Sequence, residues 1–121
     1  MQKKVLLIDD EESVRLSLGF WLRRNNFAVT LCGGTEDAGR ALERNVYDYV
    51  ISDFRLTPRG EEGVALLAKA REINPAAKCI LVTATPANEL PTSLERVGVY
   101  SLHQKPVDVF ELLRLLGPAL P

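Results

Sequence analysis

The chain has 121 residues, of which 46% are hydrophobic and 26% are charged, and its formal net charge is −1. This length fits one domain, and the composition is that of a folded globular protein rather than a disordered one. The near-balance of 15 basic and 16 acidic residues argues against direct nucleic-acid binding, and the apolar runs are too short to span a membrane. Because residues 1–4 show no secretory signal, we expect a cytoplasmic location.

Strand-like and helical patterns alternate along the chain. Residues 4–8 form a continuous apolar run, which is typical of a strand buried on both faces. Further strands are predicted at residues 27–32, 49–52, 79–82 and 99–104. Amphipathic spacing, capping residues and helix breakers predict helices at residues 13–25, 35–45, 63–74, 87–96 and 107–116. Thr35 is the expected N-cap of the second helix, and residues 55–62 form the expected loop after the third strand.

Five strands joined by helical crossovers predict an α/β fold with one doubly wound, five-stranded parallel sheet and helices on both faces. We expect the domain to cover residues 1–117 and residues 118–121 to begin a linker or C-terminal tail. Cys32 and Cys79 lie in apolar, strand-like surroundings without metal-ligand spacing, so we expect both to be buried, reduced thiols.

Chemically active residues follow four of the five predicted strands. Asp9 and Asp10 follow the first strand, Asp53 the third, Thr83 the fourth and Lys105 the fifth. In open parallel sheets, ligands bind at the carboxyl ends of the strands, so these side chains are expected to meet at one edge. Each residue alone is weak evidence for a site, and their convergence is the strong signal.

Three carboxylates placed close together repel one another unless a cation lies between them. Carboxylate oxygens suit Mg²⁺, which keeps several waters and bridges protein carboxylates to phosphate oxygens. A carboxylate beside the metal can act as the nucleophile toward a phosphoryl group. The ammonium of Lys105 can neutralise the transferred group, and the hydroxyl of Thr83 can donate a hydrogen bond to it. These residues therefore predict a phosphoryl-acceptor site.

Over nearly its whole length the chain resembles the receiver domain of two-component response regulators. The residues that carry the resemblance are Val5-Leu6-Leu7-Ile8-Asp9-Asp10-Glu11, Asp53 after an apolar strand, Thr83-Ala84 and Lys105-Pro106. The resemblance implies a flavodoxin-like sheet with strand order 2-1-3-4-5. It also implies a signalling domain rather than a turnover enzyme. This domain would accept a phosphoryl group from a sensor histidine kinase or a phosphotransfer domain.

The resemblance further assigns a role to each site residue. Asp53 would be the phosphorylation site, and it would bind Mg²⁺ directly together with Asp10; Mn²⁺ can substitute. Asp9 would act largely through metal-bound water, and Arg55 would offer its backbone carbonyl. Thr83 would be the switch hydroxyl and Lys105 the phosphate-binding ammonium, followed by a cis bond to Pro106. The implied output is control of transcription through the surface formed by the fourth helix, fifth strand and fifth helix, which is also a possible homodimer face.

The chain departs from the usual receiver pattern at two positions. Leu102 stands three residues before Lys105, where the family usually has an aromatic residue, so an aromatic rotamer switch cannot operate there in its usual form. The stretch 57–62 is about two residues longer than the common proline-glycine loop after the acceptor.

Other interpretations of these residues stay open at the level of sequence. Asp9 and Asp10 could instead cap the following helix, because carboxylates are favoured at helix N-termini. An aspartyl-phosphate phosphatase usually has a second acid two residues after the nucleophile, where this chain has Arg55. A nucleotide- or flavin-binding module would need a phosphate loop after the first strand, and the sequence has none of the usual patterns. A pseudo-receiver scaffold is disfavoured by the intact acidic set.

Overall fold

The computed structural model describes residues 2–54, 62–90 and 98–119 of the chain. The strands are β1 (Lys4–Ile8), β2 (Ala28–Cys32), β3 (Tyr49–Asp53), β4 (Lys78–Thr83) and β5 (Ser101–Gln104). The helices are α1 (Glu12–Arg24), α2 (Thr35–Arg44), α3 (Glu62–Ile73), a short 3-10 helix η1 (Ala87–Glu89) and α5 (Val109–Leu116). The Arg55 carbonyl and most of the predicted loop 55–62 lie outside the described residues.

The five strands form one parallel sheet in the order β2-β1-β3-β4-β5, which confirms the predicted fold and strand order. The pairing register places the chemically active ends side by side. Ile8 of β1 pairs with Ser52 of β3, and Asp53 pairs with Val82 of β4. Thr83 pairs with Gln104 of β5, so Lys105 follows directly at the same edge of the sheet.

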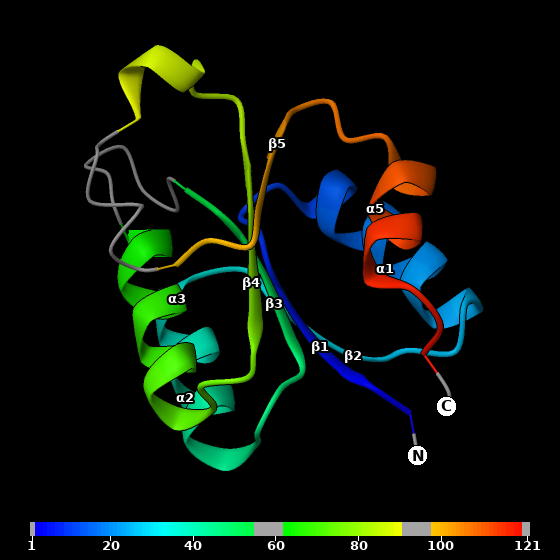
Figure 1. Ribbon diagram of the computed structural model, residues 1–121, viewed down its shortest axis with the longest axis vertical. Helices are drawn as coiled ribbons and strands as arrows, with labels where there is room; N and C mark the ends of the chain where they lie inside the picture. Colours follow the sequence, from blue (N-terminus) through cyan, green and yellow to red (C-terminus); the bar gives the residue numbers. More distant parts are fainter. Residues whose placement is uncertain (1, 55–61, 91–97, 120–121) are drawn as a thin grey trace.

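Helices cover both faces of the sheet, with α1 and α5 on one side and α2 and α3 on the other (Figure 1). The alternation of side chains along β1 explains this layering, since successive residues point to opposite faces. Leu6 and Ile8 belong to the core under α2 and α3, whereas Val5 and Leu7 belong to the core under α1 and α5. All four are buried, as the continuous apolar run predicted.

One local prediction is wrong, and another can be compared only over its first residues. Thr35 is the first residue of α2 rather than its N-cap, which is Gly34. The carboxylate of Asp37 accepts the backbone N–H groups of Gly33 and of the N-cap Gly34, so it ties the first turn of α2 to the residues before it. The predicted helix 87–96 begins as the 3-10 turn η1, and residues 91–97 lie outside the described part of the chain.

The C-terminal part of the domain packs further than expected. Ala119 is buried in the core under α1 and α5, and its carbonyl accepts the backbone N–H of Lys3 at 3.0 Å. The packed domain therefore includes Ala119, whereas the sequence placed its end at Gly117. Cys32 and Cys79 are buried free thiols, as predicted, and burial raises the pKa of each to about 11.

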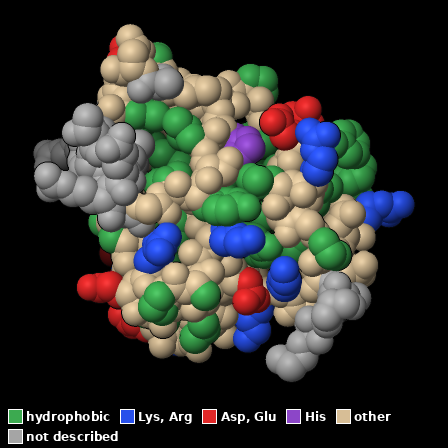
Figure 2. Space-filling view, viewed as in Figure 1, with side chains coloured by type: hydrophobic (Ala, Val, Ile, Leu, Met, Phe, Trp, Pro, Cys, Tyr) green, Lys and Arg blue, Asp and Glu red, His purple; other side chains and the backbone are tan. Residues whose placement is uncertain are grey.

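The molecular surface carries both signs of charge. On the face shown in Figure 2, basic and acidic side chains are scattered among one another, in line with the net charge of −1. Within the described residues, no helix has both the length and the apolar character needed to cross a membrane.

Candidate functional site

Four carboxylates gather at the carboxyl ends of β1 and β3. Asp9, Asp10 and Glu11 lie in the turn between β1 and α1, and Asp53 is the last residue of β3. One oxygen of each of these side chains lies within 4.8 Å of the others. Asp9 and Asp53 are buried, whereas Asp10 and Glu11 are exposed. The cluster therefore has a buried floor and an open rim.

The ammonium of Lys105 lies among three of the carboxylates. Its Nζ is 2.7 Å from Glu11 Oε1, 2.9 Å from Asp53 Oδ2 and 3.0 Å from Asp9 Oδ2. Burial alone lowers the pKa of Lys105, but the hydrogen bonds to Glu11, Asp53 and Asp9 outweigh it and raise the pKa above its ordinary value. Lys105 therefore remains a cation at neutral pH and offsets part of the negative charge of the cluster.

Burial also changes the pKa of Asp9. It raises this pKa above the ordinary value, even though the Glu11 N–H and Lys105 both lower it. The contact with Lys105 thus favours the charged forms of both partners, but it does not fully compensate for the removal of the Asp9 carboxylate from water. Asp9 carries a net cost when it is ionised in the absence of a metal ion.

The free energy of unfolding should reveal this cost as a function of pH. A carboxyl whose pKa is raised in the folded state adds stability below its unfolded pKa of 3.8 and loses it as the pH rises through the folded pKa. In EDTA, the free energy of unfolding of Asp9→Asn minus that of the wild type should therefore be larger at pH 7 than at pH 4. Urea unfolding at both pH values measures the difference. A difference that is constant or shrinks with rising pH would contradict this account.

Thr83 completes the row of strand ends. Its side chain is buried, and its Oγ1 accepts the backbone N–H of Thr85 at 3.0 Å. This bond uses a lone pair and leaves the hydroxyl hydrogen as a donor. The Thr83 carbonyl accepts the N–H of Lys105 at 2.9 Å, which ties β4 to the start of the loop after β5. The following bond, Lys105–Pro106, is cis.

The alternative that Asp9 and Asp10 serve as helix caps is not what the contacts show. The N-cap of α1 is Glu11, and it makes no side-chain capping bond. Asp9 Oδ1 instead accepts the N–H of Glu11 at 2.9 Å, which holds the turn. The sequence predicted no role for Glu11, although its position directly after two acidic residues could have indicated one. The structure places it closest to Lys105.

The donor set fits a divalent metal ion. Four carboxylate side chains supply hard oxygen atoms close enough together to share one ion, and Asp10 and Glu11 lie at the solvent side, where metal-bound waters could remain. Arg55, whose carbonyl the resemblance to receiver domains added to this set, lies outside the described residues. Leu102, at the position where receiver domains usually have an aromatic residue, is 41% exposed on β5.

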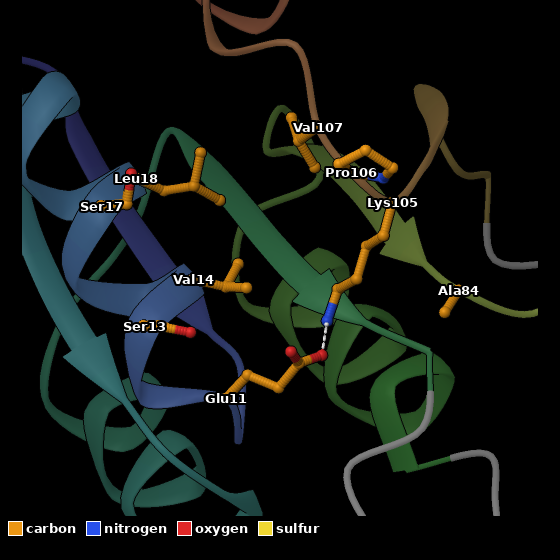
Figure 3. A pocket seen from close by; sticks show the side chains of 9 residues that line it. All are labelled: Glu11, Ser13, Val14, Ser17, Leu18, Ala84, Lys105, Pro106 and Val107. Carbon is orange, nitrogen blue, oxygen red and sulfur yellow. Dashed lines mark hydrogen bonds and ion pairs between the residues drawn. The ribbon is translucent and has the colours of Figure 1, made fainter.

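A groove of about 510 Å³ opens beside the carboxylates. Val14 and Leu18 of α1 form one wall, and Pro106 and Val107 form the other (Figure 3). The groove reaches the charged cluster through Glu11 and Lys105, which face one another at its end in Figure 3.

Comparisons with known proteins point in one direction. The family model described as the response regulator receiver domain matches residues 5–116. Among curated proteins, the chain is 29% identical over 116 residues to the transcriptional regulatory protein GlrR of Escherichia coli (strain K12), and 27% identical over 119 residues to the response regulator protein PilR of Pseudomonas aeruginosa. These alignments cover 96% and 98% of this chain but only 26% of each relative, so the chain spans about a quarter of their length.

Solved structures agree on the fold. A CheY-like receiver domain protein from Methanospirillum hungatei JF-1 has a TM-score of 0.86 at 23% identity, with 96% of this chain and 91% of that chain covered. A response regulator protein from Burkholderia pseudomallei has a TM-score of 0.83 at 22% identity, with 95% and 66% covered. The structure of that second protein was determined with a phosphorylated aspartic acid, a calcium ion and citrate.

Proposed function

Because the chain belongs to the response regulator receiver domain family, we propose that it accepts a phosphoryl group on Asp53 in a Mg²⁺-dependent reaction. The observation that carries the proposal is the position of Asp53. It lies at the end of the central strand, beside three further carboxylates and 2.9 Å from the ammonium of Lys105. The phosphorylated aspartic acid and calcium ion in the fold relative from Burkholderia pseudomallei agree with this chemistry.

Each residue has a part in the transfer. An Oδ atom of Asp53 attacks phosphorus, and the bond from phosphorus to the donor breaks, with its electron pair leaving on the donor atom. The Lys105 ammonium then neutralises a phosphoryl oxygen, and the Thr83 hydroxyl donates to another. Asp10 and Asp53 would hold Mg²⁺ directly, Asp9 would hold it through water, and Arg55 would offer its carbonyl. When bound, the ion supplies positive charge that offsets the repulsion between the carboxylates and the incoming phosphoryl group.

The donor is a sensor histidine kinase or a phosphotransfer domain, as expected for a receiver domain. The groove between α1 and the loop after β5 supports an approach from that side, because it leads to Glu11 and Lys105. The phosphorylated domain would signal through the surface of β5 and α5; the helix predicted at residues 87–96, which the resemblance adds to this surface, lies mostly outside the described residues. That surface would bind a second copy or an output domain that controls transcription, as the relatives' names suggest. The cytoplasmic location and the lack of direct nucleic-acid contact stay predictions.

A phosphorylation assay tests the proposal. Incubation with acetyl phosphate and Mg²⁺ should add one phosphoryl group per chain, measured by intact-mass spectrometry, and EDTA should suppress the reaction. A phosphoacceptor accumulates the modified form over minutes, whereas a phosphatase would release phosphate without accumulation. If no mass is added and phosphate is released continuously, the chain is a hydrolase and the proposal is wrong.

A further inference from the structure

The side chain of Arg15 reaches back from the first turn of α1 to the turn that carries the carboxylates. It is half-buried, and its Nη1 donates to the backbone carbonyl of Asp9 at 2.7 Å. This carbonyl belongs to the peptide that joins Asp9 to Asp10, so the contact fixes the plane of that peptide. The direction in which the Asp10 side chain leaves the backbone depends on the same plane.

Other bonds hold this turn at its two ends. The Asp9 N–H donates to the Cys32 carbonyl of β2 at 3.1 Å, and the Arg15 N–H donates to the Glu11 carbonyl at 3.0 Å. The Glu11 N–H donates to Asp9 Oδ1. The bond from the Arg15 guanidinium lies between these bonds, at the peptide that joins Asp9 to Asp10.

A glycine leaves room for the guanidinium. A Cβ atom at Gly33, directly after β2, would lie 3.1 Å from Arg15 Nη1 and 3.6 Å from its Cζ. This is closer than a Cβ atom normally approaches, so the guanidinium would have to shift by a few tenths of an ångström. The next residue, Gly34, offers a matched control because a Cβ atom there would meet nothing within 4 Å.

We propose that Arg15 is a positioning residue that sets the divalent-cation affinity of the carboxylate cluster by holding the Asp9–Asp10 peptide. The inference rests on the proposed function, since it assumes that these carboxylates bind the ion. Arg15 would not be a ligand of the ion, because a guanidinium is a donor with no acceptor atom. Its effect passes through the Asp9 carbonyl, in the way that groups behind metal ligands orient them and tune affinity.

The sign of the effect separates positioning from charge. A guanidinium beside a cation site repels the ion, so removing its charge alone would tighten Mg²⁺ binding. Loss of the contact with the Asp9 carbonyl would instead let the peptide turn, and the carboxylates would no longer be held for the ion. Positioning therefore predicts weaker binding in Arg15→Ala, on the order of tenfold.

Two measurements on the wild type, Arg15→Ala, Gly33→Ala and Gly34→Ala test the inference. Calorimetric titration with Mg²⁺ should show the large loss in Arg15→Ala, a smaller loss in Gly33→Ala and no change in Gly34→Ala. In the Arg15→Ala background, Gly33→Ala should have no further effect, because the group that it displaces is gone. Amide hydrogen exchange in EDTA should be faster at Glu11 in Arg15→Ala than in the wild type.

Several outcomes would overturn the inference. Mg²⁺ binding in Arg15→Ala that equals or exceeds the wild-type affinity would assign Arg15 a charge effect or none. Equal affinities of Gly33→Ala and Gly34→Ala would also contradict it, and this comparison remains available if Arg15→Ala does not fold. Wild-type protein that binds no Mg²⁺ would refute the proposed function instead. The exchange rate of the Glu11 amide in EDTA would then decide separately whether Arg15 holds the turn.

Discussion

Asp53→Asn should lose phosphoryl acceptance from acetyl phosphate while it keeps the wild-type fold. The amide has nearly the shape of the carboxylate and can still accept a hydrogen bond from Lys105, which lies 2.9 Å from Asp53 Oδ2. It lacks the nucleophilic oxygen anion, so transfer to this position should fall to the background level. Intact-mass spectrometry after incubation with Mg²⁺ and acetyl phosphate measures the modified fraction.

The control for this variant is Asp48→Asn. Asp48 lies directly before β3, at the end of the strand opposite to Asp53, where its Oδ2 accepts the N–H of Lys4. This substitution should leave the phosphorylated fraction unchanged, which separates loss of the acceptor from loss of any carboxylate on this strand. Undiminished labelling of Asp53→Asn would place the acceptor elsewhere, with Asp9 and Asp10 the next carboxylates to examine.

Gly63→Ala should both destabilise the domain and impair phosphoryl acceptance. A Cβ atom at Gly63, in the first turn of α3, would overlap the backbone carbonyl oxygen of Asp53 and lie 3.1 Å from that of Phe54. These are backbone atoms, so the overlap can be relieved only by moving α3 or the end of β3. Overpacking of this kind costs about 1–3 kcal/mol, and here the displaced segment carries the acceptor.

Gly39→Ala provides the contrast. Gly39 lies inside α2, and a Cβ atom there would meet nothing within 4 Å. Alanine is favoured over glycine in a helix interior by about 0.5–1 kcal/mol, so this variant should be more stable than the wild type. Urea unfolding gives both stabilities, and the acetyl phosphate assay gives the effect on acceptance. Wild-type stability of Gly63→Ala would mean that α3 can move away from β3 without cost.

The strands could be predicted because their signal is local, whereas their order in the sheet came from the resemblance to receiver domains. Each central strand is a continuous apolar run, and burial on both faces of a parallel sheet requires that pattern. The residues at the strand ends followed from the same pattern, since parallel strands bring their carboxyl ends to one edge. The register of Asp53 opposite Val82 and of Thr83 opposite Gln104 bears out that placement.

Features that depend on contacts between distant segments could not be predicted in the same way. The residues around Gly63 do not predict its close approach to the Asp53 backbone. In the same way, the residues around Gly33 do not predict its proximity to the Arg15 guanidinium. The start of α2 was misplaced by one residue: its N-cap is Gly34, and the Asp37 carboxylate accepts the N–H groups of Gly33 and Gly34. Propensity identifies residues that can cap a helix, but it does not decide at which of two neighbouring residues the helix begins.

The central claim is that Asp53 carries the phosphoryl group, and direct location of the modification tests it most directly. Wild-type protein is phosphorylated with acetyl phosphate and Mg²⁺ and then reduced with borohydride, which converts an aspartyl phosphate to homoserine. Peptide mass spectrometry then locates the homoserine. The account predicts homoserine at position 53 and unchanged aspartate at positions 9 and 10. Homoserine at either of those positions, with Asp53 unmodified, would contradict it.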